Sequence, residues 1–116
     1  MIRVPLNEDI TVKLDGSGNG TVKLGPTSGA EKWYPTVTSV KVSTNINEAV
    51  AKTYSGDAVK DNNFVDGTFS GSSGDASDRI SGQEITFGNW VWNVWTGGDA
   101  NAVATLVVYG EKEIPG

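Results

Sequence analysis

Carboxylates are the side chains in this sequence that could perform acid–base chemistry. The sequence has no histidine and no cysteine, which removes the commonest general base, the usual zinc ligands and the thiolate nucleophiles. Two carboxylates can in principle hydrolyse a glycosidic bond, but nearly all the acidic residues lie in Gly- and Ser-rich turns, where they are ordinary. We therefore expect no enzyme and no cofactor. The acidic candidates are Glu8, Asp9, Asp57, Asp61, Asp66, Asp75, Asp78, Glu84 and Asp99.

Residues 70–78, SGSSGDASD, form the segment whose composition best suits a phosphate or metal loop. No lysine follows at the position that a phosphate-binding loop requires, and no helical pattern opens after the segment. Asp75 and Asp78, with Asp66, lack the spacing and the closing glutamate of a calcium-binding EF-hand. Because Asp and Ser side chains often close their own turns, a flexible turn without a metal is expected here.

Three of the four tryptophans lie in residues 88–99, GNWVWNVWTGGD. Three explanations compete: a core strand, a surface that binds a protein partner, or a platform of rings that stacks on sugar. Side chains of a strand alternate between its two faces, so Trp90 and Trp92 share one face and Trp95 lies on the other. A sugar platform needs its rings on one plane, so carbohydrate is the less favoured partner. Its hydrogen bonds would come from Asn93, Asp99 and Asn101.

The elements that position these residues are strands. Apolar and polar residues alternate in short runs bounded by Gly, Asn, Asp and Ser, and no long helical pattern occurs. Such runs lie at 10–14, 21–24, 36–44, 48–54, 64–69, 79–88, 89–95 and 102–114. About seven or eight antiparallel strands at this spacing predict an all-β fold, a single β-sandwich or jelly-roll-like domain over residues 1–116.

Two hairpins are expected at the ends of the chain. The repeated TVKL, whose copies are separated by DGSGNG, predicts a hairpin over 10–24. We expect Lys13 opposite Thr21 in this hairpin, because the next register would pair Lys13 with Lys23, and like charges directly opposite are destabilising. The last two strands, joined by TGGDAN, predict a second hairpin over 90–109.

In the second hairpin, the alternation of side chains between the two faces of each strand predicts which residues lie in the core and which lie on the surface. The last strand has small alanines in one of its apolar rows, and alanines beside large indoles would fill a core layer. The core residues expected on this basis are Trp90, Trp92, Leu106 and Val108, and further core contacts are Ile80, Ile85 and Phe87. Val37 falls out of phase with its strand, which predicts either a bulge near Thr38 and Ser39 or a Val37 that faces the opposite side.

The reverse face of this hairpin would be more apolar than the surface that a monomer normally exposes. Either the chain covers it, with the N-terminal hairpin or the segment at 33–34, or a protein partner does. Exposed aromatic patches usually mark interfaces, which favours the partner. The candidate interface residues are Trp33, Tyr34, Val91, Trp95, Val103, Val107 and Tyr109.

Charge and hydropathy exclude other classes of partner. The formal net charge is -5, and the basic residues are spread along the chain, whereas binding to a phosphate backbone needs clustered Lys and Arg. The N-terminal MIRVPLNEDITVKL lacks the apolar segment of a signal peptide, and no run of about 18 apolar residues occurs. Neither nucleic acid nor a membrane is an expected partner, and the chain is expected to be soluble without a secretion signal.

Six strings of the sequence carry a family resemblance: LGP (24–26), EKWYPT (31–36), VKVST (40–44), YSGD (54–57), VDGTFSGSSGDASD (65–78) and VWTGGDANAVATLVVYG (94–110). They resemble strings of small virion proteins of tailed bacteriophages. The similarity extends over most of the chain from residue 24 onward. It is to head decoration, or capsid-stabilising, proteins and to related short tail modules.

This resemblance implies a β-sandwich that binds an assembled particle, adds no chemistry and often gathers as trimers at local symmetry positions. The expected partners are then the major capsid protein and the protein itself, as a homotrimer. The expected location is the outer surface of the capsid, after synthesis in the host cytoplasm. No functional residue carries over individually. A phage tail module and a carbohydrate- or receptor-binding β-sandwich stay open as alternatives.

Overall fold

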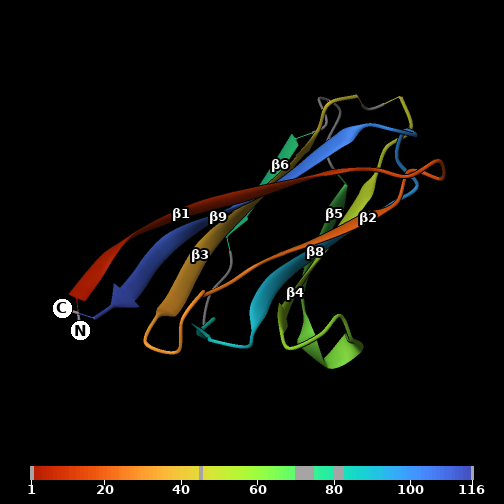
Figure 1. Cartoon of the computed structure of the whole chain (residues 1–116). Coiled ribbons are helices and arrows are strands. Elements are labelled where there is room, and N and C mark those ends of the chain that lie inside the picture. Colours follow the sequence, from red (N-terminus) through yellow and green to blue (C-terminus); the bar gives the residue numbers. More distant parts are fainter. Residues whose placement is uncertain (1, 45, 70–74, 80–82, 116) are drawn as a thin grey trace.

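The computed structural model describes residues 2–44, 46–69, 75–79 and 83–115, and strands make up most of this part of the chain (Figure 1). The strands are β1 (Ile2–Lys13), β2 (Gly20–Leu24), β3 (Lys32–Val42), β4 (Val50–Gly56), β5 (Phe64–Phe69), β6 (Asp75–Arg79), β7 (Ile85–Thr86), β8 (Trp90–Thr96) and β9 (Val103–Ile114). A single 3-10 turn, η1 (Asp61–Asn63), precedes β5. The predicted all-β fold is confirmed, and β6, in a segment expected to be a turn, adds one strand to the expected number.

Two antiparallel sheets pack face to face. The five-stranded sheet has the order β1-β9-β3-β6, with β7 paired to β3, and the four-stranded sheet has the order β2-β8-β4-β5. The connections β1–β2, β3–β4 and β8–β9 each carry the chain from one sheet to the other. This arrangement is the predicted single-domain β-sandwich, in which the inner faces of the two sheets form one core. No helix in the described part of the chain is long and apolar enough to cross a membrane.

The two TVKL segments do not form the expected hairpin. β1 pairs with β9, where Lys13 lies opposite Val103, and β2 pairs with β8, where Lys23 lies opposite Trp92. The predicted pairing of Lys13 with Thr21 is therefore wrong. The apolar residues of the two segments instead face each other across the core. Pairing along the whole of β9 satisfies many more backbone groups than a hairpin between two short TVKL segments would.

The expected C-terminal hairpin is wrong for a similar reason. β8 lies between β2 and β4 in the four-stranded sheet, whereas β9 lies between β1 and β3 in the five-stranded sheet. Both are central strands, so each is paired on both sides. The two strands therefore contribute to opposite walls of the core, and side chains that parity places on one hairpin face lie on different surfaces of the molecule.

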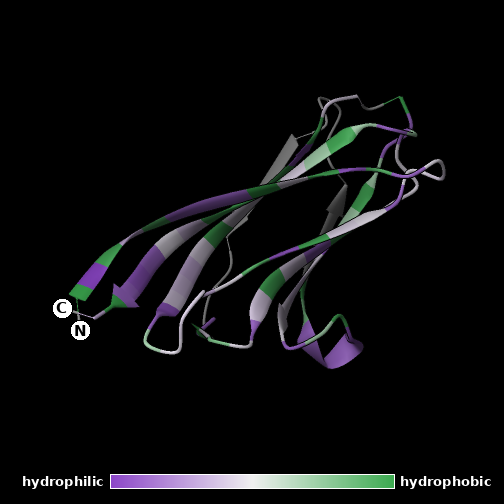
Figure 2. Cartoon of the chain, in the orientation of Figure 1, coloured by the Kyte–Doolittle hydropathy of each residue, from purple (hydrophilic) through white to green (hydrophobic). Residues whose placement is uncertain are grey.

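The core lies between the sheets and follows the alternation of the strands. Figure 2 shows hydrophobic and hydrophilic residues alternating along them. Leu106 and Val108 are fully buried, as predicted, and so is Ile85. Phe87 is 59% exposed and the prediction for it is wrong, because it lies in the turn between β7 and β8. Ile80 lies outside the described residues.

Strand β3 contains an irregularity, slightly earlier than predicted. The register with β9 shifts between Pro35 and Val37, so Val37 faces outward while Thr38 is buried. Gly110 lies opposite Pro35, and a Cβ at this glycine would overlap the carbonyl oxygen of Tyr34. The bulge therefore needs a glycine in β9, since no other residue allows the two backbones to approach so closely.

Hydrogen bonds between loops hold one end of the sandwich. The Asp99 carboxylate, in the β8–β9 loop, accepts the N–H groups of Ile46 and Asn47 in the β3–β4 loop at 2.9 and 2.8 Å. These two backbone donors, Asn47 first, lower the pKa of Asp99 below its ordinary value. The Gly97 N–H donates to Asn19 Oδ1 at 3.1 Å and joins the β1–β2 loop to the same cluster. Asp99 is therefore a loop-capping residue.

The acidic segment considered for a metal or phosphate falls partly outside the described residues, which omit 70–74. Its second half does not form the expected turn: residues 75–78 belong to β6, which pairs with β3 through Asp75 opposite Lys41 and Asp78 opposite Thr38. Among the residues that the structure describes, no group of three or more acidic side chains is placed to hold a metal ion.

Candidate functional site

The tryptophan strand β8 presents its side chains in the opposite phase to the one predicted. Trp95 and Asn93 are fully buried, Val91 is buried beside them, and Trp90 and Trp92 are half-buried on the outer face. The predicted packing of alanines of the last strand beside Trp90 and Trp92 is wrong, because the core indole is that of Trp95. Its cross-strand partner in β4 is Ala51, and the same core contains Ala49, Ala102 and Ala104.

The burial of Asn93 argues against the sugar-binding surface considered for residues 88–99. Its Oδ1 accepts a hydrogen bond from Thr53 Oγ1 at 2.9 Å in the core. Its Nδ2, like Trp95 Nε1, has no hydrogen-bond partner among the described residues. Asp99, the second proposed sugar ligand, already caps a loop. Of the three predicted polar ligands, only Asn101 is exposed.

The outer face of the four-stranded sheet instead carries an aromatic row that crosses all four strands. Cross-strand pairing places Lys23, Trp92, Tyr54 and Phe64 side by side in this order. Trp90 lies two residues before Trp92 and points to the same face. We call these five residues the aromatic face. They come from segments far apart in the sequence, and pairing of their backbones brings them together.

The rings of the aromatic face form two pairs. Trp90 and Trp92 lie edge to face, with centroids 5.8 Å apart and an interplanar angle of 76°. Tyr54 and Phe64 repeat this geometry at 5.7 Å and 74°. The Lys23 Nζ lies 3.9 Å from the Trp90 ring centroid and 5.0 Å from that of Trp92, which is a cation–π contact. The tryptophan pair is thus covered by a lysine of the same chain.

The second ring pair borders a hollow of about 340 Å³. Its walls are the two rings, the Lys52 side chain and the Asp61 carboxylate of η1. Phe64 is 49% exposed. Nearby, the pKa of Asp57 is lowered by a hydrogen bond from the Asn63 side chain and by Lys60, and these contacts hold the turn that carries Asp61. The hollow therefore combines an apolar corner with one positive and one negative group.

The outer face of the five-stranded sheet has a different character. Val103, Val107 and Tyr109 of β9 point outward, with Val37 opposite Tyr109. Val103 is 43% and Tyr109 is 39% exposed. We call these four residues the β9 stripe. Their neighbours on the same face are polar or charged, with Lys13 opposite Val103 and Asp9 opposite Val107. Thr11 lies opposite Thr105 with their hydroxyls 3.4 Å apart.

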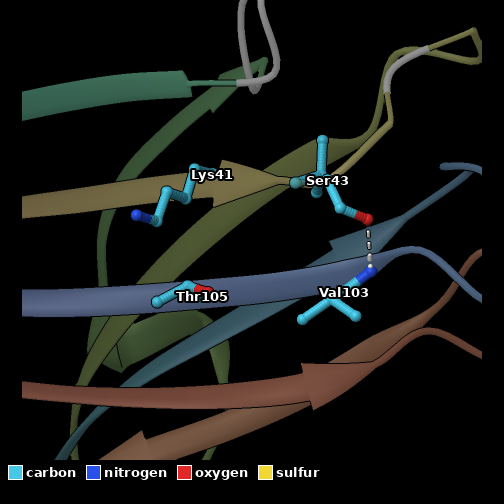
Figure 3. A pocket seen from close by; sticks show the side chains of 5 residues that line it. Lys41, Ser43, Val103 and Thr105 are labelled. Atoms are coloured by element: carbon cyan, nitrogen blue, oxygen red, sulfur yellow. Dashed lines mark hydrogen bonds between the residues drawn. The ribbon is translucent and has the colours of Figure 1, made fainter.

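One end of the β9 stripe borders a smaller hollow of about 150 Å³ (Figure 3). Val103 lines it together with Lys41, Val42 and Thr105. The Val103 N–H donates to Ser43 Oγ at 2.9 Å, a bond that fixes the end of β3 against β9.

The predicted interface residues divide into two groups. The outer face of the five-stranded sheet brings together Tyr34, Val103, Val107 and Tyr109. Tyr34 lies farther along this face, with the Arg3 guanidinium 4.1 Å from its ring centroid. The other three predicted residues are buried, and for them the interface prediction is wrong: Trp33, Val91 and Trp95. Trp33 instead donates its Nε1–H to Glu31 Oε1 at 2.6 Å.

Sequence reasoning missed Tyr54, Phe64 and the two lysines of the four-stranded sheet. A signal for Tyr54 was present in the run EAVAKTY, where Ala49, Ala51 and Thr53 alternate with larger residues. The small residues are buried and the larger ones lie outside. That these larger residues join the tryptophans could not be inferred, since it depends on which strands are neighbours.

Comparison with known proteins concerns the fold. The mitogen of Yersinia pseudotuberculosis has a crystal structure that matches with a TM-score of 0.57, covering 90% of this chain and 86% of that chain at 10% identity. PliG, a periplasmic inhibitor of g-type lysozyme from Aeromonas hydrophila, matches with a TM-score of 0.45, covering 93% and 86% at 11% identity. No family model and no curated protein matches the sequence. The likeness to the mitogen shows a shared β-sandwich fold.

Proposed function

We propose that this chain is a non-enzymatic structural protein of a tailed-phage virion, a head decoration protein that binds the assembled capsid. It docks on the outer surface of the shell through the five-stranded sheet, with the β9 stripe at the centre of the contact. The major capsid protein is its partner, and copies of the chain gather as trimers. The phage-like strings in the sequence motivate the virion assignment, and the β9 stripe motivates the docking face.

The β9 stripe is the observation that carries this proposal. It places Val103, Val107, Tyr109 and Val37 on one open sheet face whose surroundings are polar or charged. An apolar centre with a polar rim is the usual composition of a protein interface, and tyrosine is among the residues that contribute most to binding. The strands β1, β9 and β3 are the longest in the described part of the chain and give this face a broad extent.

Binding of this kind stabilises a particle without chemistry. A protein that binds the assembled shell and not its separated subunits shifts the equilibrium toward the shell. The stabilisation grows with the concentration of the free decoration protein relative to its dissociation constant. A compact sandwich with one apolar stripe is sufficient for this role.

The test is the composition of purified particles from the phage genome that encodes the chain. Heads are separated from tails and analysed by quantitative mass spectrometry. We expect the chain in heads, in a fixed ratio to the major capsid protein. Finding it in tails alone would replace the proposal by a tail module, and its absence from particles would overturn the virion role. Heads stripped of the chain should disassemble at a lower temperature than heads to which it is restored.

A further inference from the structure

The hollow beside Tyr54 and Phe64 has the composition of a small-ligand site. It lies on the face opposite the β9 stripe, so a sandwich docked through the five-stranded sheet leaves it open to solution. Its volume of about 340 Å³ is comparable to that of pockets that bind small molecules. This inference therefore goes beyond the docking function and does not depend on it.

The two rings form a corner and not a flat platform. Their planes meet at 74° with centroids 5.7 Å apart. One ring face is then available for stacking, while the other ring closes the side of the hollow. A ligand with an apolar C–H surface and a compact outline fits this corner, whereas a long flat polymer would need several parallel ring faces.

The charged walls select for a neutral ligand that both donates and accepts hydrogen bonds. Lys52 supplies donors and Asp61 supplies acceptors. Among the residues that the structure describes, neither forms an ion pair within 4.0 Å, so both are available to a ligand. Because the charges of Lys52 and Asp61 cancel, a ligand with a net charge gains no net electrostatic attraction from the pair. Hydroxyl groups can satisfy both charges at once.

The tryptophan pair on the same face is a ring pair whose surface is already covered by another side chain. There the Lys23 ammonium lies over the rings at 3.9 and 5.0 Å. The Tyr54–Phe64 pair has the same edge-to-face geometry, but its neighbouring lysine lines an open hollow. The face thus has one ring pair covered by its own chain and one pair open to a ligand.

We propose that this hollow binds a neutral pyranose sugar. The sugar stacks its C–H face on one ring of the Tyr54–Phe64 corner, accepts hydrogen bonds from the Lys52 ammonium and donates hydroxyl hydrogens to the Asp61 carboxylate. The corner geometry limits the contact to a single sugar unit, as at the end of a glycan. A sandwich bound to a particle by its other face would present this site outward.

The experiment is an NMR titration of the folded protein with methyl glycosides of glucose, galactose and N-acetylglucosamine, and with methyl glucuronide as the charged comparator. We expect at least one neutral glycoside to bind with a dissociation constant of about 1 to 10 mM, with amide shifts confined to β4, η1 and β5. No saturable shift with any neutral glycoside at about 50 mM would overturn the proposal. So would tighter binding of the glucuronide.

Matched variants locate the site. Phe64→Ala should weaken binding about three- to tenfold through loss of the ring contact, whereas Phe87→Ala, which removes another exposed phenylalanine, should not change it. Lys52→Met should weaken binding about tenfold, and Lys41→Met at the other hollow should have no effect. Equal losses in variant and control, or retained binding in Phe64→Ala, would place the sugar elsewhere. Because these measurements use the isolated protein, they are independent of whether the chain binds a capsid.

Discussion

The two outer faces of the sandwich are built by the same alternation and yet differ in chemistry. The five-stranded sheet presents the β9 stripe, in which valines and one tyrosine lie among polar and charged residues on long strands. The four-stranded sheet presents four aromatic rings and two lysines, with a hollow at one end. We propose the first face as the surface that docks on a protein and the second as a site for a small ligand.

The difference shows that neighbouring strands, and not the central strand alone, determine the chemistry of an outer face. β9 and β8 each lie in the middle of their sheet, and each has a buried row that packs in the core. The outward row of β9 carries the apolar residues of the β9 stripe. On the other face, the outward row of β8 carries the tryptophan pair, and the hollow beside it is lined by β4, η1 and β5.

The largest expected effect is a difference in stability loss between substitutions of buried and of outward-facing residues of β8. Trp95→Ala should lower the free energy of unfolding by about 3 to 5 kcal/mol, because it empties the centre of the core. Trp92→Ala should lower it by about 1 kcal/mol, since it loses a half-exposed ring and one hydrogen bond from Nε1 to the Gly56 carbonyl. Urea unfolding of both variants measures the difference. Equal losses would contradict the assigned phase of the strand.

The second prediction tests which face docks. Tyr109→Ser should weaken binding to heads by about 2 kcal/mol, roughly thirtyfold, as the loss of a central interface tyrosine does. Trp92→Ser removes an aromatic ring from the opposite face and should leave binding within about threefold. Co-sedimentation with stripped heads measures both. The reverse result would move the docking site to the aromatic face.

A smaller effect concerns the lysine that covers the tryptophan pair. Lys23→Met should lower the free energy of unfolding by about 0.5 to 1 kcal/mol, the usual contribution of a cation–π contact at an exposed site. Lys41→Met, on the other outer face, should change stability by less than about 0.5 kcal/mol. Thermal unfolding compares them, and an unchanged midpoint for Lys23→Met would show that the contact contributes nothing.

The smallest effect concerns Asp99, which links loops that join the two sheets. Its pKa is lowered on folding by the backbone N–H groups of Asn47 and Ile46. Its contribution to stability is therefore present above the unfolded-state pKa of about 3.9 and lost as pH falls through the lower folded-state pKa. Asp99→Asn should be less stable than the natural chain at pH 7, and the gap should close in acid. Asp61→Asn is the control, and an equal pH-dependent gap there would mean that the loop hydrogen bonds are not the cause.

The amino-acid pattern determined several features that the structure confirms. Alternation of apolar residues predicted the strands, the all-β sandwich and the burial of Leu106, Val108 and Ile85. Alternation also predicted that the three neighbouring tryptophans divide between two faces. These features follow from local periodicity, which each strand has regardless of its neighbours.

Tertiary structure alone decided which strands are neighbours and which side of each one lies inside. Both expected hairpins are replaced by pairings with other strands, so β1 and β2, like β8 and β9, lie in opposite sheets. Trp95, and not Trp92, is the core indole, and its cross-strand partner in β4 is the small Ala51. Period-two alternation is symmetric between the two faces of a strand, and only packing against specific partners removes that symmetry.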